Sequence, residues 1–130
     1  MKPSMKHTLL LLLVLAVFGW LLGETLSAYQ RAGKEDFLNE LVFGCTKWSK
    51  DFTDAKFRAV RTGMPSAEVR RILGDPVLEQ TDNDGRDVWH YAYGKRPDNN
   101  GVYADCDYTE RAVIITDGQV SSVTRGFYFD

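Results

Sequence analysis

The stretch Phe57–Pro76, FRAVRTGMPSAEVRRILGDP, decides the fold of this chain. Its apolar residues recur at helical spacing in two runs, which are separated by Gly63, a residue that lets the backbone turn sharply. The second run opens at Pro65, because proline suits the first turn of a helix, and it ends at Gly74. Pro76 then forbids further helix. The stretch therefore predicts two short helices joined by a tight turn.

Each of the two helices presents one apolar face. The first is expected over residues 51–61 and the second from Pro65 to Gly74. The side chains that we expect to point inward are Phe52, Phe57, Val60, Val69, Ile72 and Leu73. We expect these two faces to cover a sheet.

Beyond this stretch the apolar spacing changes from the period of a helix to that of a strand. Strands are predicted over residues 88–93, 108–116 and 119–127, and Asp117-Gly118 is a strong signal for a two-residue hairpin. The fold class is therefore α+β, with a helix pair packed on a three-stranded antiparallel sheet. Alternation along the first strand places Trp89, Tyr91 and Tyr93 on one face, which we expect to face the helices.

The N-terminus has the pattern of an export signal. Lys2 and Lys6 precede residues 9–22, which hold no charge or strongly polar group. The run is short for a membrane span, at about 21 Å, and a longer span must accommodate Glu24. The region near Ala28 lacks the two small residues of a good cleavage site. Two interpretations stay open, an uncleaved signal anchor and a cleaved signal peptide. In both, the remainder of the chain is exported.

The chain is thus expected to divide into three parts. Residues 1–23 form the signal peptide or signal anchor, residues 24–50 a linker with a short amphipathic helix, and residues 51–130 the α+β domain. The apolar run does not end in a cysteine, so there is no lipoprotein signal. We expect the domain to lie outside the cytoplasm, anchored in a membrane or released after cleavage.

Composition excludes several classes of protein. Hydrophobic residues make up 44% of the 130 residues and charged residues 26%, which is typical of a globular protein and excludes a disordered chain. The net charge is −2, and no cluster of lysine and arginine offers a nucleic-acid surface. We expect no nucleic acid among the partners.

Cys45 and Cys106 are the two cysteines of the chain. Because exported proteins form disulfides, we predict a bond between them, which would close a loop of about 60 residues. The alternative is two unpaired cysteines that pack as small apolar side chains.

The sequence offers little for catalysis. The two cysteines and His90 could nominally form a thiol nucleophile with its base, but neither cysteine begins a helix or belongs to a C-x-x-C motif. A thiol enzyme is therefore the least favoured hypothesis. We expect no catalytic residues, no metal site and no cofactor.

The fold-deciding stretch also carries a family resemblance. The pattern F-x-x-V-x-x-G-M, then E-V-x-x-x-L-G-x-P, precedes an aromatic strand and a closing D-G-x-V hairpin. It resembles the SmpA/OmlA family, the BamE-like module of the outer-membrane β-barrel assembly machinery, over Phe57 to about Val123. The resemblance implies a helix pair on a three-stranded sheet, similar to the repeats of β-lactamase inhibitory protein. The motif positions are Gly63, Met64, Glu68, Val69, Leu73, Gly74 and Pro76.

The resemblance implies a non-enzymatic interaction module of the cell envelope, with a periplasmic domain that is anchored in the inner membrane or released after signal cleavage. Its implied role is outer-membrane assembly or maintenance, and its implied partners are envelope proteins such as β-barrel assembly components. The matched residues are turn and core residues, which specify a fold better than a function. A second hypothesis therefore stays open: a secreted or membrane-tethered binding module, inhibitor-like, with no part in outer-membrane assembly.

Two surfaces are candidates for partner binding. The first is the aromatic tail Phe127, Tyr128 and Phe129, because three aromatic residues near a terminus dock either on their own domain or on a partner. The second is formed by Arg70 and Arg71 on the outer side of the second helix, which suit acidic groups of a partner or lipid headgroups.

Overall fold

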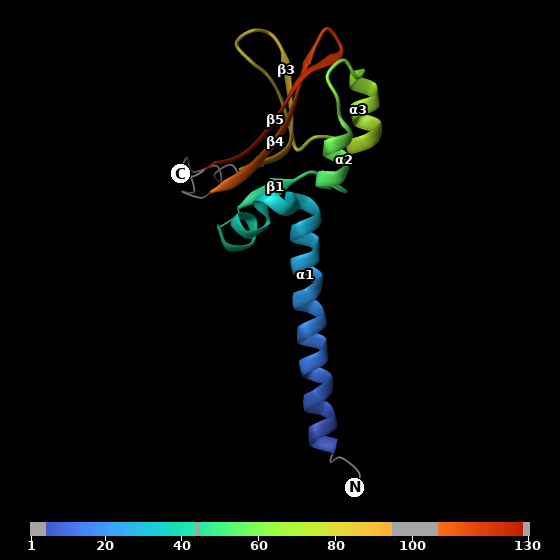
Figure 1. Ribbon diagram of the computed structural model, residues 1–130, viewed down its shortest axis with the longest axis vertical. Helices are drawn as coiled ribbons and strands as arrows, with labels where there is room; N and C mark the ends of the chain where they lie inside the picture. The colour runs from blue at the N-terminus through green and yellow to red at the C-terminus, as the bar shows by residue number, and fades with distance from the viewer. Residues whose placement is uncertain (1–4, 44, 95–106, 129–130) are drawn as a thin grey trace.

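The computed structural model describes residues 5–43, 45–94 and 107–128 (Figure 1). Within these residues the chain forms three helices and five strands. In chain order they are α1 (Met5–Phe43), β1 (Thr46–Trp48), α2 (Asp54–Ala59), α3 (Ser66–Leu73), β2 (Leu78–Thr81), β3 (Asp87–Gly94), β4 (Tyr108–Thr116) and β5 (Gln119–Tyr128). The α+β class and the N-terminal apolar helix agree with the prediction.

The prediction of a three-stranded sheet was wrong, because the described residues form a five-stranded antiparallel sheet. The strands expected at residues 88–93, 108–116 and 119–127 are β3, β4 and β5. Two further strands pair with the outer edge of β3. β2 pairs with its first half, where Leu78 lies opposite His90, and β1 pairs with its end, where Thr46 lies opposite Gly94.

Local chemistry sets the limits of the two short helices. α2 begins after Thr53, whose side-chain oxygen accepts the backbone N–H of Lys56 over 3.3 Å. α3 begins after Pro65 and ends at Gly74, where φ is +75°. The hydroxyl of Tyr91 on β3 donates to the carbonyl of Gly74 over 3.1 Å, which fastens the end of α3 to the sheet.

The turn between α2 and α3 is bonded to β5. Gly63 has φ of +86°, and its N–H donates to the carbonyl of Val120 over 2.8 Å. The N–H of Val120 donates in return to the carbonyl of Met64 over 2.9 Å. The helix pair is therefore held against one face of the sheet through backbone hydrogen bonds as well as through the core.

The core lies between α2, α3 and this sheet face. Its buried members are Phe52, Phe57, Val60, Val69, Leu73, Trp89, Tyr91, Val113, Ile115 and Val120. They include two residues of the predicted aromatic row, but the third, Tyr93, packs its ring against His90 at 4.6 Å between centroids. The register of β3 shifts between His90 and Ala92, and this extra residue breaks the alternation that would have kept the row on one face.

Helix α1 rises from the N-terminus as a long stalk and turns aside beneath the sheet (Figure 1). Its apolar part is exposed, and it is long and apolar enough to cross a membrane. Residues 24–43 of the expected linker are helical, and the helix is kinked at Gly33, where φ is 76° and ψ is 177°. A Cβ atom at Gly33 would lie 2.6 Å from Oδ2 of Asp54, so the kink depends on glycine.

Candidate functional site

A partly buried ion-pair cluster joins the kinked helix to the domain. At its centre is Arg111 on β4, whose side chain is fully buried. Its guanidinium donates to the carboxylate of Asp36 and, over 3.1 Å, to the carbonyl of Ala32, both on α1. The Nε atom of Arg111 lies 3.7 Å from Oδ1 of Asp54 on α2. We call Arg58, Arg111, Arg125, Asp36 and Asp54 the junction cluster.

Asp54 is the carboxylate that most of this cluster shares. Its side chain is 8% exposed, and it accepts hydrogen bonds from Nε of Arg58 at 2.6 Å and from Nη2 of Arg125 at 2.7 Å. The hydrogen bond to Asp54 raises the pKa of Arg58 above its ordinary value, so this guanidinium stays charged. Because Asp54 lies on α2, Arg111 on β4 and Arg125 on β5, the cluster fixes one geometry between helix and sheet.

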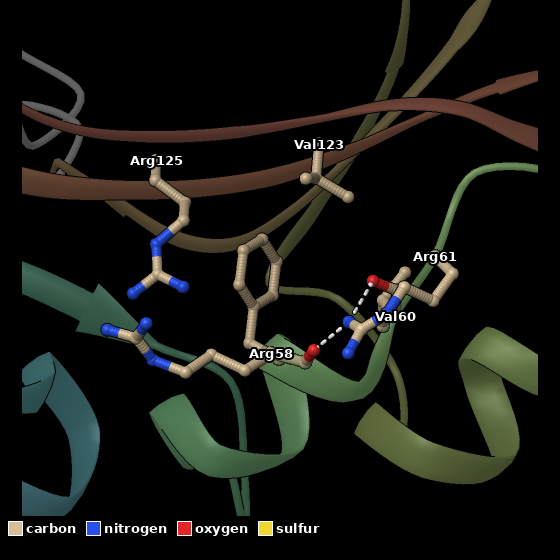
Figure 2. A pocket seen from close by; sticks show the side chains of 6 residues that line it. Arg58, Val60, Arg61, Val123 and Arg125 are labelled. Carbon is tan, nitrogen blue, oxygen red and sulfur yellow. Dashed lines mark hydrogen bonds between the residues drawn. The ribbon is translucent and has the colours of Figure 1, made fainter.

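An open pocket lies beside the junction cluster, between α2 and β5 (Figure 2). Its volume is about 360 Å³. Its lining residues are Phe57, Arg58, Val60, Arg61, Val123 and Arg125. The pocket combines apolar side chains with three guanidinium groups. Such a lining suits a partner side chain that carries a negative charge on an apolar stem.

The three arginines differ in their existing partners. Arg58 and Arg125 point toward one another in Figure 2 and share the carboxylate of Asp54. Arg61 donates to two backbone carbonyls, those of Arg58 and Val60. Within the part of the chain that the structure describes, no carboxylate lies within ion-pair distance of Arg61. Arg61 is therefore the arginine of this pocket with most capacity for an added anion.

The predicted aromatic tail is partly integrated into the sheet. Phe127 and Tyr128 belong to β5, where they lie opposite Thr109 and Tyr108. Phe127 is half-buried, whereas Tyr128 is exposed and stacks on Tyr108 with 5.1 Å between ring centroids. Phe129 lies outside the described residues. The tail stays a prediction as a partner surface.

The predicted arginine pair on α3 is separate from the tail. Figure 1 places α3 over one part of the sheet and the end of β5 at the other. Arg70 bonds Glu79 at 2.7 Å and Asp75 at 2.8 Å, and its guanidinium lies 4.2 Å from the centre of the Trp89 ring. Arg71 is exposed and has a weaker contact with Glu68, at 3.3 Å. Arg70 therefore acts mainly within the domain, and Arg71 is the more accessible of the two.

Of the two cysteines, the structure describes one. Cys45 lies directly before β1, and its backbone N–H donates to the carbonyl of Asp107 over 3.1 Å. This contact brings Cys45 to the residue that follows Cys106 in the sequence. Cys106 itself lies outside the described residues, so the disulfide stays a prediction.

His90 is buried on the sheet face that the helices leave uncovered. Its Nε2 lies 2.9 Å from the side-chain nitrogen of Gln80, and its Nδ1 lies 3.4 Å from Oε1 of Glu110. Both ring nitrogens thus face Gln80 and Glu110, an arrangement that suits a structural histidine. Among the described residues, no three His, Cys, Asp or Glu side chains are grouped to hold a metal ion.

Reasoning from the sequence missed the junction cluster and the pocket. The alternation of β4 places Arg111 on the same face as Val113 and Ile115. An arginine on a core face is unusual and indicates a buried ion pair, so this signal was present in the sequence. Its partner Asp36 is 75 residues away and belongs to a helix that the sequence assigned to a linker. No local signal links them.

The comparison with protein-family models gives one match to this fold. The model of the outer membrane protein assembly factor BamE domain matches residues 52–121, which run from Phe52, the first core residue, to the third residue of β5. No individually curated protein matches the chain. The match covers more than half of the chain and includes every position of the sequence motif from Gly63 to Pro76. The chain is a member of the BamE domain family.

Proposed function

We propose that this protein is a non-enzymatic, membrane-anchored interaction module of the cell envelope. Its BamE domain binds an acidic segment of a partner protein that takes part in outer-membrane assembly or maintenance. The observation that carries the proposal is the arginine-lined pocket between α2 and β5, on a domain whose family is one of outer-membrane assembly factors.

The chemistry of the pocket supports an acidic partner. A guanidinium presents planar, paired donors that match a carboxylate, and Arg61 supplies one at the rim. Val123, which is 40% exposed, provides apolar area on which the methylene groups of a glutamate or the ring of a neighbouring aromatic residue can pack, and the buried Phe57 and Val60 lie behind it. Val123 lies on the edge strand β5, opposite the α2 residues that line the pocket.

The anchor in this proposal is the apolar part of α1. Lys2 and Lys6 stay on the cytoplasmic side, the helix crosses the inner membrane, and the domain lies in the periplasm. In this proposal the tether is thus a protein helix. The predicted disulfide fits this oxidising compartment.

The test is affinity purification of the full chain, tagged at its C-terminus, after crosslinking in cells. Arg61→Gln removes the accessible charge of the pocket. Arg71→Gln removes the accessible charge of α3, and Arg86→Gln is the matched control, because Arg86 is a partly exposed arginine in the β2–β3 turn. Each variant is first compared with the parent protein by circular dichroism, so that lost binding is not mistaken for lost folding.

We expect β-barrel assembly components among the captured proteins, with a clear loss in the Arg61→Gln variant and none in the Arg86→Gln variant. A loss confined to Arg71→Gln would move the interface to α3 and refute the pocket. Capture of envelope proteins that have no part in outer-membrane assembly would support the second hypothesis, a tethered binding module with another use.

A further inference from the structure

The short helical segment after the kink has an apolar face that the domain does not cover. We call residues 34–43 the post-kink helix. Figure 1 shows that α1 turns aside at its upper end, so that this segment runs across the top of the stalk and under the sheet. Its exposed apolar residues are Leu38, Leu41 and Val42, which are 67%, 46% and 64% exposed.

The direction of this face follows from helix geometry. Asp36 points to the domain, since it bonds the buried Arg111. Successive helical residues are rotated by about 100°, so Leu38, Leu41 and Val42 lie on the side opposite Asp36. The domain lies above the post-kink helix in Figure 1 and the stalk lies below it. The apolar face therefore points toward the end from which the stalk rises.

The length of the stalk sets the level of this face relative to a membrane. A helix needs about 20 residues to cross the hydrocarbon core, so a span that begins at Leu9 ends near Ala28. Gly33 follows about five residues later, or about 8 Å along the helix, which is close to the depth of one headgroup layer. The kink thus lies where the headgroups meet water.

The residues around the kink are of types that gather at the membrane–water interface. Tyr29 is a residue type that gathers at membrane interfaces, and its ring packs edge-on against Phe37 with 5.7 Å between centroids. This contact ties the stalk to the post-kink helix at the kink. Arg31 and Lys34 are exposed and stand at the same level, where cationic side chains meet lipid phosphates.

We propose that the post-kink helix is an interfacial membrane helix. Leu38, Leu41 and Val42 enter the headgroup region of the same bilayer that the stalk crosses, and Asp36 on the opposite side holds the BamE domain through Arg111. The domain is thereby fixed in one orientation at the membrane surface and does not swing on a tether. This inference rests on the proposed membrane anchor. It adds a second contact between the chain and the bilayer. In this contact the apolar face of the post-kink helix is covered by lipid and not by a protein partner.

The test uses the purified full chain in phosphatidylethanolamine–phosphatidylglycerol vesicles. A photoreactive benzoylphenylalanine replaces Leu38 in one variant and Val42 in a second, and it replaces Val123 in the matched control. Val123 is also an exposed apolar residue, but it lies on β5 beside the pocket. After illumination, mass spectrometry counts lipid adducts and protein adducts at each position.

We expect several-fold more lipid adduct at positions 38 and 42 than at position 123. Equal lipid adduct at all three positions, or adduct to a second copy of the chain at position 38, would overturn the interfacial helix. The mass of the intact chain tests the anchor separately. If the chain lacks its first residues up to about Ala28, the anchor fails, and lipid adduct at position 38 on added vesicles still decides the inference.

Discussion

The substitution Asp54→Asn tests whether the junction cluster holds α1, α2 and the sheet together. It keeps the shape of the side chain and removes its charge. The amide oxygen can still accept one hydrogen bond, but the amide nitrogen then faces guanidinium donors of Arg58 and Arg125, which bond Asp54 at 2.6 and 2.7 Å. Arg111, fully buried, keeps Asp36 as its remaining carboxylate.

The expected loss of stability follows from burial. Removing one member of a buried ion pair costs about 3–5 kcal/mol, because the opposite charge stays desolvated. Arg58 is half exposed and recovers part of its hydration, so we place the loss in the free energy of unfolding near the lower limit, at about 3 kcal/mol. For a domain of this size that corresponds to a melting temperature lower by about 12–24 °C.

The assay is urea unfolding of the full chain in nanodiscs, followed by tryptophan fluorescence. Trp89 in the core and Trp48 packed against it report unfolding of the domain, and a Trp20→Phe background removes the signal of the apolar helix. Urea is chosen because guanidinium chloride would screen the ion pairs. The matched control is Asp75→Asn. Asp75 bonds Arg70 at 2.8 Å, but its side chain is 90% exposed, so a loss below about 1 kcal/mol is expected. If Asp54→Asn costs no more than Asp75→Asn, burial does not strengthen the cluster and the reasoning is wrong.

Three further outcomes are expected. Gly33→Ala should lower stability by about 1–3 kcal/mol, because φ is positive there and the added Cβ meets Asp54, whereas Gly23→Ala, with open space around it, should be neutral or slightly stabilising in the same urea assay. The nearby imidazole of His90 lowers the pKa of Glu110 below its ordinary 4.5, so the carboxylate stabilises the fold above about pH 4.5 and this contribution is lost as the pH falls further. Glu110→Gln should therefore flatten the acid side of a plot of stability against pH, and an unchanged slope would contradict that role. The predicted disulfide should appear as a mass 2 Da below that of the reduced chain, and its reduction should cost about 2–4 kcal/mol in the urea assay; two alkylatable thiols in the untreated protein would refute it.

The strands β3, β4 and β5 were predictable because their signals are local. Apolar alternation marks a strand that is buried on one face, and Asp117-Gly118 supplies the two positive φ values, 52° and 76°, that a tight hairpin needs. These determinants lie within a few residues of the structure that they specify.

The strands β1 and β2 were missed because their signals lie elsewhere in the chain. β2 reads Leu-Glu-Gln-Thr, and three of its four residues are exposed, so it has no apolar face to detect. It is a strand because β3 offers unpaired backbone groups along its edge. β1 has three residues and pairs with the last part of the same edge.

The candidate pocket and the family motif share one stretch of sequence but use different positions in it. In F-x-x-V-x-x-G-M, the fixed positions Phe57 and Val60 are buried, and with Val123 they form the apolar part of the pocket. The variable positions include Arg58 and Arg61, which bring the charges to its rim. The motif thus supplies two buried residues next to the pocket but none of its charged groups. Under the proposed function, the arginines that stand between the motif positions, and not the motif itself, select an acidic partner.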